Sequence, residues 1–472
     1  MKMLLEDRWV DRNERIEVRN PESAAVVDTV PRGDAADAER ALTHAESGAR
    51  AAGALPVHER MRILHAAADA VLDTHETFAR RIATEGIKTI REARREATRC
   101  ADTLRLSAEE ARRAHGETVP FDQRPGSEGR VGYWRPVPVG IVVAITPFND
   151  PLNLVAHKLG PALAAGNAVV LKPDSRTPLS ALALAEVLFE AGLPDGMLQV
   201  ITGPGSDIGP TLVGDRRVRT VSFTGGRDTG ERIARQAGLK KLSMELGSNA
   251  PALVMEDADL DVAVPACVAG AFAAAGQNCL HVQRVFVHRA CADAFTARFV
   301  EGARAVRTGP KLDEATDMGP MIDEEAARRV EALVQDAAGA GAELLQGGTR
   351  EGSVMAPTVM AGVPPTHELA RDEVYGPVTL IETFRDPAEA VARANDVDFG
   401  LQAGVFTRDL AAAHRLADAL RYGGVMINDS SDYRIDAMPF GGFKGSGLGR
   451  EGVRFAMEAM TEPKLVCFTL SP

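Results

Sequence analysis

The chain has 472 residues, about three times the ~150 residues of an average domain, so we expect more than one folded unit. Its 54 Lys and Arg residues against 66 Asp and Glu residues give a formal charge of −12, which disfavours nucleic acid and anionic lipid surfaces as partners. No apolar run approaches the roughly 18 residues that span a bilayer, and no apolar core of a secretory signal follows the first methionine. We therefore expect a cytoplasmic protein with no membrane partner.

The cysteines are too few and too scattered for a disulfide framework. No CxxC pair or Cys/His cluster has the spacing of a zinc site, so we expect no metal. All five should be free thiols (Cys100, Cys267, Cys279, Cys291 and Cys467).

The first predicted elements are helices. Between residues 35 and 113, apolar positions such as Met61, Leu64 and Val71 recur at helical spacing and predict two or three long helices. From residue 140 onward, short apolar strands alternate with helices. Strands are expected at 140–145, 168–172, 197–201, 219–223 and 241–246, with helices at 152–165, 179–191 and 228–236. Apolar strands joined by helices indicate a parallel sheet covered on both faces, which is a doubly wound α/β fold.

The alternation begins again after Gly247, with strands at 250–255 and 284–289, and the chain becomes glycine-rich after Tyr422. We therefore expect a second α/β unit between these two positions. Segments 130–137 and 464–470 alternate like exposed strands, and such edges normally find a partner. They predict a homo-oligomer in which these strands cross between subunits.

Three polar residues lie where chemistry could occur. Cys279, in AGQNCLHVQR, is expected on a turn facing a cleft, although a lone cysteine is more often an inert buried residue. Glu245 ends a predicted strand and could be a general base or an exposed charge. Asn149 also follows a strand, and its amide could stabilise an oxyanion or cap the next helix.

Two glycine-rich turns follow neighbouring strands, GPGSDIG at 203–209 and FTGGRDTG at 223–230. Their glycines would let backbone amides and helix N-termini approach a pyrophosphate. Two such turns in one sheet favour a dinucleotide-binding function.

Taken together, seven ordered motifs closely resemble those of the aldehyde dehydrogenase superfamily over essentially the whole chain. They are Asn149 in TPFN, Lys172 in LKPDS, FTGG at 223–226, Glu245 in MELGSNAP, Cys279 in GQNC, Glu373 in DEVYGPV and PFGGFKGSGLGREG from Pro439. The resemblance implies a Rossmann-like NAD(P)-binding domain (1–115 and 138–246) and an α/β catalytic domain (247–422), on which the active-site loop 423–450 packs. It also implies a small β element (116–137 and 455–472) that builds a homodimer or homotetramer.

The resemblance also implies a mechanism. Cys279 would be the nucleophile that forms a thiohemiacetal and then a thioester, Asn149 would hold the oxyanion, and Glu245 would activate the hydrolytic water. A glutamate at this position favours hydrolysis over acyl transfer to coenzyme A. A coenzyme A-acylating semialdehyde dehydrogenase and a catalytically silent protein on the same fold remain as alternatives.

Cofactor contacts carry over by the same motifs. Lys172 matches the residue that holds the adenosine ribose, and Glu373 the one that binds the nicotinamide ribose. Ser175 stands where NAD-preferring members often have Glu, so both NAD and NADP are possible. The remaining expected contacts are Thr146, Pro147, Gly205, Gly209, Phe223, Thr224, Gly225, Gly226, Leu246 and Tyr375.

The substrate pocket departs from the usual family pattern, because Asp150 replaces an aromatic residue of the Pro-Trp-Asn-Phe-Pro motif. Asn153 and His157 share one helix face, and Arg105 and Arg434 could supply positive charge, with structural salt bridges as the alternative for each. These residues predict a small anionic aldehyde substrate of the phosphonoaldehyde or semialdehyde type.

Overall fold

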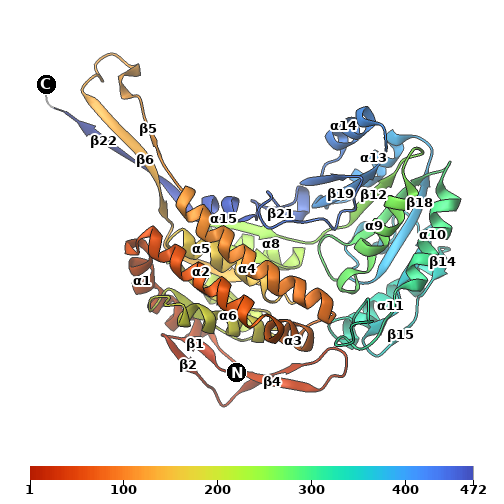
Figure 1. The fold of residues 1–472 in the computed structure, drawn as a ribbon, viewed down its shortest axis with the longest axis horizontal. Helices are drawn as coiled ribbons and strands as arrows, with labels where there is room; N and C mark the ends of the chain where they lie inside the picture. Colours follow the sequence, from red (N-terminus) through yellow and green to blue (C-terminus); the bar gives the residue numbers. More distant parts are fainter. Residues whose placement is uncertain (471–472) are drawn as a thin grey trace.

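The computed structural model describes residues 1–470 and has two lobes and a projecting arm (Figure 1). The first lobe is built on a sheet of eight strands. Five inner strands run parallel, and β1 and β21 pair antiparallel with the outer two of these five. Strand β2 pairs antiparallel with β1 and forms the edge of the sheet. The predicted parallel α/β fold is confirmed. In spatial order the strands are β2 (Arg8–Val10), β1 (Met3–Leu5), β9 (Leu198–Val200), β8 (Ala168–Lys172), β7 (Ile141–Ile145), β10 (Val218–Thr224), β11 (Lys241–Glu245) and β21 (Gly447–Leu448).

Helices cover both faces of this sheet because successive residues of each buried strand point to opposite sides. Val169 and Leu171 of β8 pack in one apolar cluster, and Ala168 and Val170 pack in the other. One face is covered by α2 (Val57–Asp73), α3 (His75–Glu85), α4 (Ile90–Arg113), α5 (Asn153–Ala164) and α6 (Leu179–Glu190), and the other by α1 (Ala35–Ala54), α7 (Gly205–Gly214) and α8 (Arg227–Ala237).

Segment 35–113 forms four helices rather than the two or three expected. Pro56 separates α1 from α2, because proline has no backbone N–H to donate inside a continuing helix and is tolerated where a helix begins. Thr74 separates α2 from α3. Gly86 ends α3, and a capping box of Thr89 and Glu92 starts α4. The continuous helical periodicity hid these three breaks.

The second lobe is built on a seven-stranded sheet, parallel except for its edge strand β14. Its strands, in spatial order, are β14 (Glu343–Gln346), β17 (Thr358–Ala361), β18 (Val378–Phe384), β13 (Val282–His288), β12 (Ala250–Val254), β19 (Gln402–Phe406) and β20 (Gly424–Ile427). One face carries α9 (Leu260–Phe272), α10 (Ala292–Ala305), α11 (Glu324–Gly339) and α12 (Glu368–Arg371), and the other carries α13 (Pro387–Asn395) and α14 (Leu410–Ala419).

A three-stranded arm projects from the first lobe (Figure 1). Strands β6 (Arg130–Pro138) and β22 (Thr461–Thr469) pair antiparallel along their whole length, and β5 (Glu117–Thr118) adds a short edge. Residues 453–459 form helix α15, so the C-terminal strand begins later than residue 455. The last two positions of the expected element, 471–472, lie outside the described residues.

Smaller elements complete the fold. A hairpin of β3 (Arg15–Arg19) and β4 (Val26–Pro31) follows the first two strands, and a second hairpin joins β15 (Arg350–Glu351) to β16 (Val354–Met355). Within residues 1–470 no helix is both long and apolar enough to cross a membrane.

Candidate active site

One large cavity of about 1060 Å³ lies between the two lobes. Its first wall contains the carboxyl ends of β7, β8, β10 and β11, which is the edge where open α/β sheets place their ligands. Its second wall contains residues 273–274 and 278–280, which precede β13, together with Glu373 and Tyr375, which precede β18. The cavity therefore joins both sheets at one site.

Cys279 reaches this cavity from a strained turn. Ala274 and Ala275 adopt left-handed backbone angles (φ 50° and 53°), and Gly276 follows with φ 68°. Such angles are costly for residues with a side chain and are found most often at functional sites. The Cβ of any other residue at position 276 would lie 2.2 Å from the Gly376 carbonyl oxygen, so this position requires glycine. Burial raises the pKa of the Cys279 thiol, while the positive charge of Arg434 opposes that shift.

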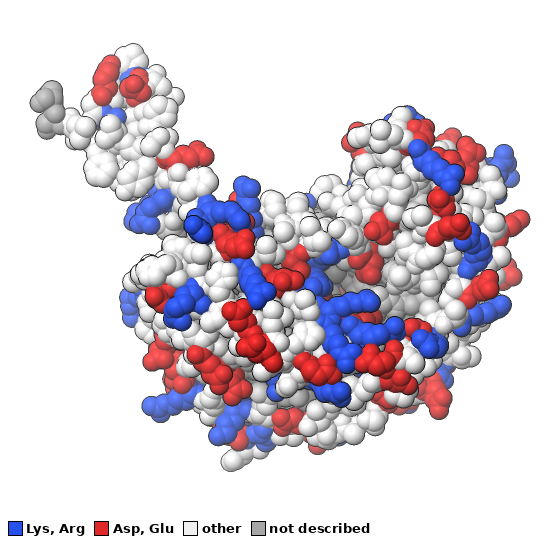
Figure 2. Space-filling model, in the orientation of Figure 1, with Lys and Arg blue, Asp and Glu red and all other residues white. Residues whose placement is uncertain are grey.

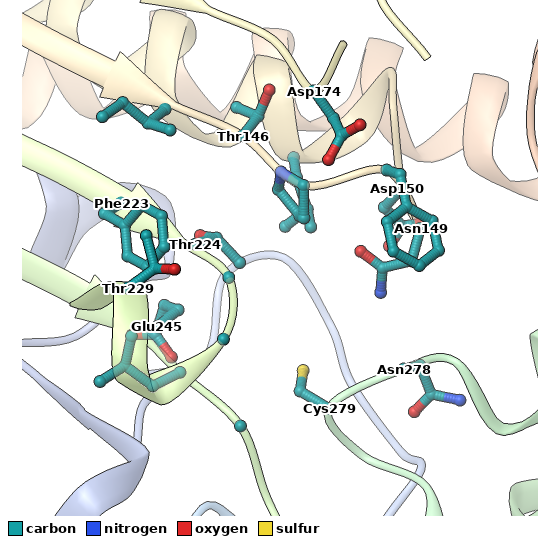
Figure 3. Close-up of a pocket in the computed structure, with 18 of the residues that line it drawn as sticks. Thr146, Asn149, Asp150, Asp174, Phe223, Thr224, Thr229, Glu245, Asn278 and Cys279 are labelled. Carbon is teal, nitrogen blue, oxygen red and sulfur yellow. The ribbon is translucent and has the colours of Figure 1, made fainter. Parts of the chain in front are cut away.

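Asn149 faces Cys279 across the cavity (Figure 3). The asparagine is 7 % exposed, and its Oδ1 is buried without a hydrogen-bond partner. It does not cap the following helix, since Glu96 Oε1 accepts from the N–H groups of Leu152 and Asn153 at 2.7 and 3.0 Å. The capping alternative is therefore wrong, and the Asn149 amide is free to contact a bound molecule.

Glu245 is the last residue of β11, and its side chain also lines the cavity (Figure 3). It is 2 % exposed, and neither carboxylate oxygen has a hydrogen-bond partner. Burial raises the pKa of Glu245 well above its ordinary value, and the nearby negative charge of Glu451 raises it further. An unpaired carboxyl group of this kind can accept a proton from a neighbouring group and release it again.

A buried ion-pair network borders Glu245, and its central residue, Glu451, was not predicted. Glu451 Oε1 accepts from Lys158 Nζ at 3.0 Å, and Glu451 Oε2 accepts from Arg434 Nη2 at 3.0 Å. The guanidinium of Arg434 also lies over the Phe440 ring, 3.8 Å from its centroid. Because Arg434 is already paired, its charge is not freely available to a substrate. The position of Glu451 inside the GREG motif was the available signal.

The other half of the cavity contains the residues expected to hold the cofactor. These are Thr146, Pro147, Lys172, Gly205, Gly209, Phe223, Thr224, Gly225, Gly226, Leu246, Glu373 and Tyr375. Ser175 does not line the cavity, because its hydroxyl turns away to donate to the Gly203 carbonyl at 2.8 Å.

This half of the cavity fits a dinucleotide. Thr146 Oγ1 is buried without a partner, and Lys172 Nζ donates only to the Pro173 carbonyl, at 2.9 Å. Helices α7 and α8 begin at the cavity with no side-chain cap, so their first N–H groups can meet an anion. A Cβ on Gly226 would meet nothing within 4 Å, which leaves room for a phosphate. Burial raises the pKa of Glu373 to about 7.

Three of the four predicted substrate residues do not line the cavity. Arg105 lies on the face of α4 that packs against α2, where it pairs with Asp69 at 2.7 Å. His157 and Asn153 are buried and donate to Asp436 Oδ1 at 2.8 and 3.3 Å. The prediction that these three residues face the substrate is wrong, because a carboxylate from a distant loop occupies the polar face of α5. Of the four, the cavity is lined only by Arg434.

The charged residues at the cavity mouth come mainly from the N-terminal half of α4 and the residues before it (Figure 2). Lys88 contacts Asp150 and also pairs with Glu96 at 2.9 Å, while Arg99 pairs with Asp436 at 2.6 Å. Sequence reasoning singled out Asp150 but missed the charged residues of α4 that line the cavity, Glu92, Arg95, Glu96 and Arg99, although their helical spacing places them on one face of that helix. The full charged set is Lys88, Glu92, Arg95, Glu96, Arg99, Asp150 and Asp432.

A parallel sheet with glycine turns at one edge, facing a second lobe that presents a cysteine, is typical of an oxidoreductase that works through a covalent thiol adduct. Residues 9–466 match the model of the aldehyde dehydrogenase family, and the chain belongs to that family. The resemblance found in the motifs is thus confirmed.

Three known proteins illustrate the relationship. The chain is 51 % identical to aspartate-semialdehyde dehydrogenase 1 of Pseudomonas canavaninivorans, over 96 % of this chain and 97 % of the relative. It is 44 % identical to 3-sulfolactaldehyde dehydrogenase of Priestia aryabhattai, over 98 % and 96 %. Among solved structures, the NADP-dependent glyceraldehyde-3-phosphate dehydrogenase of Bacillus halodurans, complexed with NADP, superposes with a TM-score of 0.97 at 37 % identity, covering 100 % of this chain and 99 % of that one.

Proposed function

We propose that this protein oxidises a small anionic aldehyde to the carboxylic acid with NAD or NADP, without transfer to coenzyme A. The observation that carries the proposal is the presence of Cys279, Asn149 and Glu245 on one cavity that also contains two glycine-rich turns. The nucleophile, the oxyanion donor, the base and the dinucleotide site are all available within that space.

The first step is attack of the Cys279 sulfur on the aldehyde carbon. The thiol gives up its proton, the new S–C bond forms, and the carbonyl oxygen becomes an oxyanion. The Asn149 side-chain N–H (Nδ2) and the Cys279 backbone N–H would donate to this oxyanion, since both residues line the cavity. Burial favours the protonated thiol, so the reacting thiolate forms by releasing its proton to solvent before the attack, and Glu245 acts only in the later hydrolytic step.

The second step releases the acid. Bound NAD(P)+ would supply the hydride acceptor for the oxidation, and Cys279 would then carry the oxidised carbon as an acyl thioester. Glu245 takes a proton from a water molecule as the water attacks the acyl carbon. The C–S bond then breaks, and the product leaves as a carboxylate. Lys172 and Glu373 would hold the two ribose units, and the N-termini of α7 and α8 would hold the pyrophosphate.

The anionic nature of the substrate is supported by the charge at the mouth. Among residues 1–470 Arg95 has no ion-pair partner, and Arg99, about one helical turn later on the same side of α4, is 31 % exposed. The relatives named above act on aspartate semialdehyde, 3-sulfolactaldehyde and glyceraldehyde 3-phosphate, which carry a carboxylate, a sulfonate and a phosphate. A phosphonoaldehyde remains within the same class.

We also propose that the arm assembles the protein into a homodimer or homotetramer, and that the protein is cytoplasmic. The proposed assembly is supported by apolar side chains that the arm leaves exposed in one chain, including Val131, Tyr133, Leu465 and Phe468. The division into cofactor, catalytic and oligomerisation segments remains a prediction.

The central test replaces Cys279 by Ala. Turnover of every aldehyde should be lost, while binding of NAD(P), followed by fluorescence titration, should persist because no cofactor contact is removed. Retained turnover would overturn the mechanism. Product analysis of the wild type with and without coenzyme A separates the two enzyme classes, because a thioester product would exclude the hydrolytic role of Glu245.

A further inference from the structure

The turn that carries Cys279 takes its shape from bonds within the second lobe. The buried side chain of Gln277 donates through Nε2 to the carbonyl oxygens of Ala274 and Pro320, both at 3.2 Å. Its Oε1 accepts from the Ile322 N–H at 2.8 Å. These contacts fix the shape of the turn, but none of them determines where the turn lies relative to the first lobe, which contributes the oxyanion donor and the cofactor half of the cavity.

One side chain of the first lobe bonds directly to this turn. Helix α4 begins at the boundary between the lobes (Figure 1), where the Ile90 N–H donates to the Lys311 carbonyl at 2.8 Å. Glu92, in the first turn of α4, accepts from the Ala274 N–H through Oε1 at 2.8 Å. Among residues 1–470 this is the only hydrogen bond that joins the first lobe to segment 273–280. It meets the turn at Ala274, where the backbone becomes left-handed (φ 50°).

The other carboxylate oxygen of Glu92 holds the side chain in place. Oε2 accepts from the backbone N–H and the hydroxyl of Thr89, at 2.9 and 3.0 Å, in the capping box that starts α4. A capping box requires only one oxygen of the carboxylate to accept from the N-cap N–H. The Oε1 atom is therefore available to the second lobe, and it is presented from a fixed helix start.

The side chain of Ala274 also packs against the first lobe. It is buried in a small apolar cluster with Ile87 and Phe148. Phe148 directly precedes Asn149 in the chain, so this cluster borders the segment that carries the oxyanion donor. The N–H and the methyl group of Ala274 are thus both held by the first lobe, which keeps the turn in register with it.

We propose that Glu92 is a positioning residue, which sets the place of the Cys279 sulfur relative to the groups of the first lobe that act on the same substrate. The inference rests on the proposed function, in which Cys279 is the nucleophile. Strained backbone angles persist only where surrounding contacts enforce them, so the turn should shift when the bond to Ala274 is lost. A displacement of about 1 Å between reacting groups can cost about 10²-fold in rate.

Glu92 also borders the cavity, so its negative charge could act on an anionic substrate directly. Two substitutions separate its reach from its charge. Glu92→Asp keeps the charge and can complete the capping box, as Asp37 does in the capping box of α1, but its shorter side chain cannot hold both Thr89 and Ala274. Glu92→Gln loses the charge but keeps an oxygen at the length needed to accept from the Ala274 N–H.

The test measures the rate of NAD(P)H formation in the first turnover by stopped flow, with succinate semialdehyde and with propanal. In Glu92→Asp this rate at saturating aldehyde should fall about 10- to 100-fold, by the same factor for both aldehydes, while KM changes less than about 3-fold. Glu92→Gln should retain most of the rate, with a loss of about 3-fold at most. Unchanged affinity for NAD(P) shows that each variant is folded.

Thr89→Val is the matched control, because it removes the hydroxyl of the capping box and leaves the bond between Glu92 and Ala274 in place. It should lower the midpoint of thermal unfolding and keep the wild-type rate of the first turnover.

Three results would overturn the inference and leave the proposed function intact. The first is a wild-type rate in Glu92→Asp. The second is a loss in Glu92→Gln as large as in Glu92→Asp, or confined to succinate semialdehyde, because charge would then be the cause. The third is an equal loss in Thr89→Val, which would assign the effect to the start of α4. If the wild type oxidised neither aldehyde nor any other, the proposed function itself would fail.

Discussion

The two ends of the cavity satisfy their polar groups in opposite ways. At the catalytic end, both carboxylate oxygens of Glu245 and Oδ1 of Asn149 are buried without partners. At the mouth, Arg99 pairs with the buried Asp436, which accepts from donors of three residues, and Lys88 contacts two acidic residues. Unpaired buried groups are costly, so their concentration around Cys279 indicates that they are kept free for reacting atoms. The paired charges of the mouth instead hold α4, α5 and the loop before Phe440 together.

The largest expected effect concerns the catalytic end of the cavity, where the buried polar groups are unpaired. Glu245→Gln should lower steady-state turnover about 10²- to 10⁴-fold, since the variant keeps the shape of the side chain and loses the base. Acyl enzyme should then accumulate, seen as one equivalent of NAD(P)H in a burst and as added mass on Cys279. In the wild type, deacylation should accelerate as pH rises through the raised pKa of Glu245, because the base acts when ionised.

Two results would contradict the proposed role of Glu245. A Glu245→Gln variant whose first turnover is slowed as much as its later turnovers would place the essential proton transfer before acylation. A wild-type deacylation rate that does not change with pH over the range in which the enzyme stays folded would contradict the role of a carboxyl group with a raised pKa.

The second expected effect concerns the paired charges near the mouth of the cavity and changes the free energy of unfolding. Burial would raise the pKa of Asp436, but the hydrogen bond from His157 and the charge of Arg99 hold it well below its ordinary value. Burial and the charge of Arg434 lower the pKa of His157 itself, so we take His157 as a neutral donor and Arg99 as the cation. Asp436→Asn should lower the free energy of unfolding by about 2 kcal/mol at pH 7.

The pH dependence of the stability that Asp436 contributes follows from the lowered pKa of this residue. The contribution of Asp436 is complete above the ordinary pKa of an aspartate and is lost progressively as pH falls below that value. Denaturant unfolding of the wild type and Asp436→Asn should therefore converge in acid. Asp432→Asn is the control, because its carboxylate has no ion pair to lose. Equal destabilisation by the two substitutions would contradict the distinction between paired and free carboxylates.

The same contrast explains what the sequence could predict. Cys279, Glu245 and Asn149 lie in short motifs at strand ends and turns, where position along the chain determines position at the sheet edge. His157 and Asn153 were placed on one face of α5 correctly, yet the face alone did not reveal that Asp436, 279 residues from His157, would cover it. The partner of a helix face is set by tertiary packing, and a single sequence contains no signal for it.

Arg95 gives the smallest effect and tests the mouth most directly. Arg95→Ala should raise KM for a carboxylated aldehyde about 3- to 10-fold with little change in kcat, and leave an uncharged aldehyde such as propanal unaffected. The effect is modest because Arg95 is exposed, so its attraction for an anion is screened by water and salt. The difference in KM between the wild type and Arg95→Ala should become smaller as ionic strength rises from about 0.05 to 0.5 M.

Arg105→Ala is the control. It removes an arginine of the same helix that pairs with Asp69 outside the cavity, and it should change KM for neither aldehyde. If both variants raised KM alike, or if Arg95→Ala affected propanal equally, long-range charge or helix stability would explain the result, and the free guanidinium at the mouth would have no role in recognising the substrate.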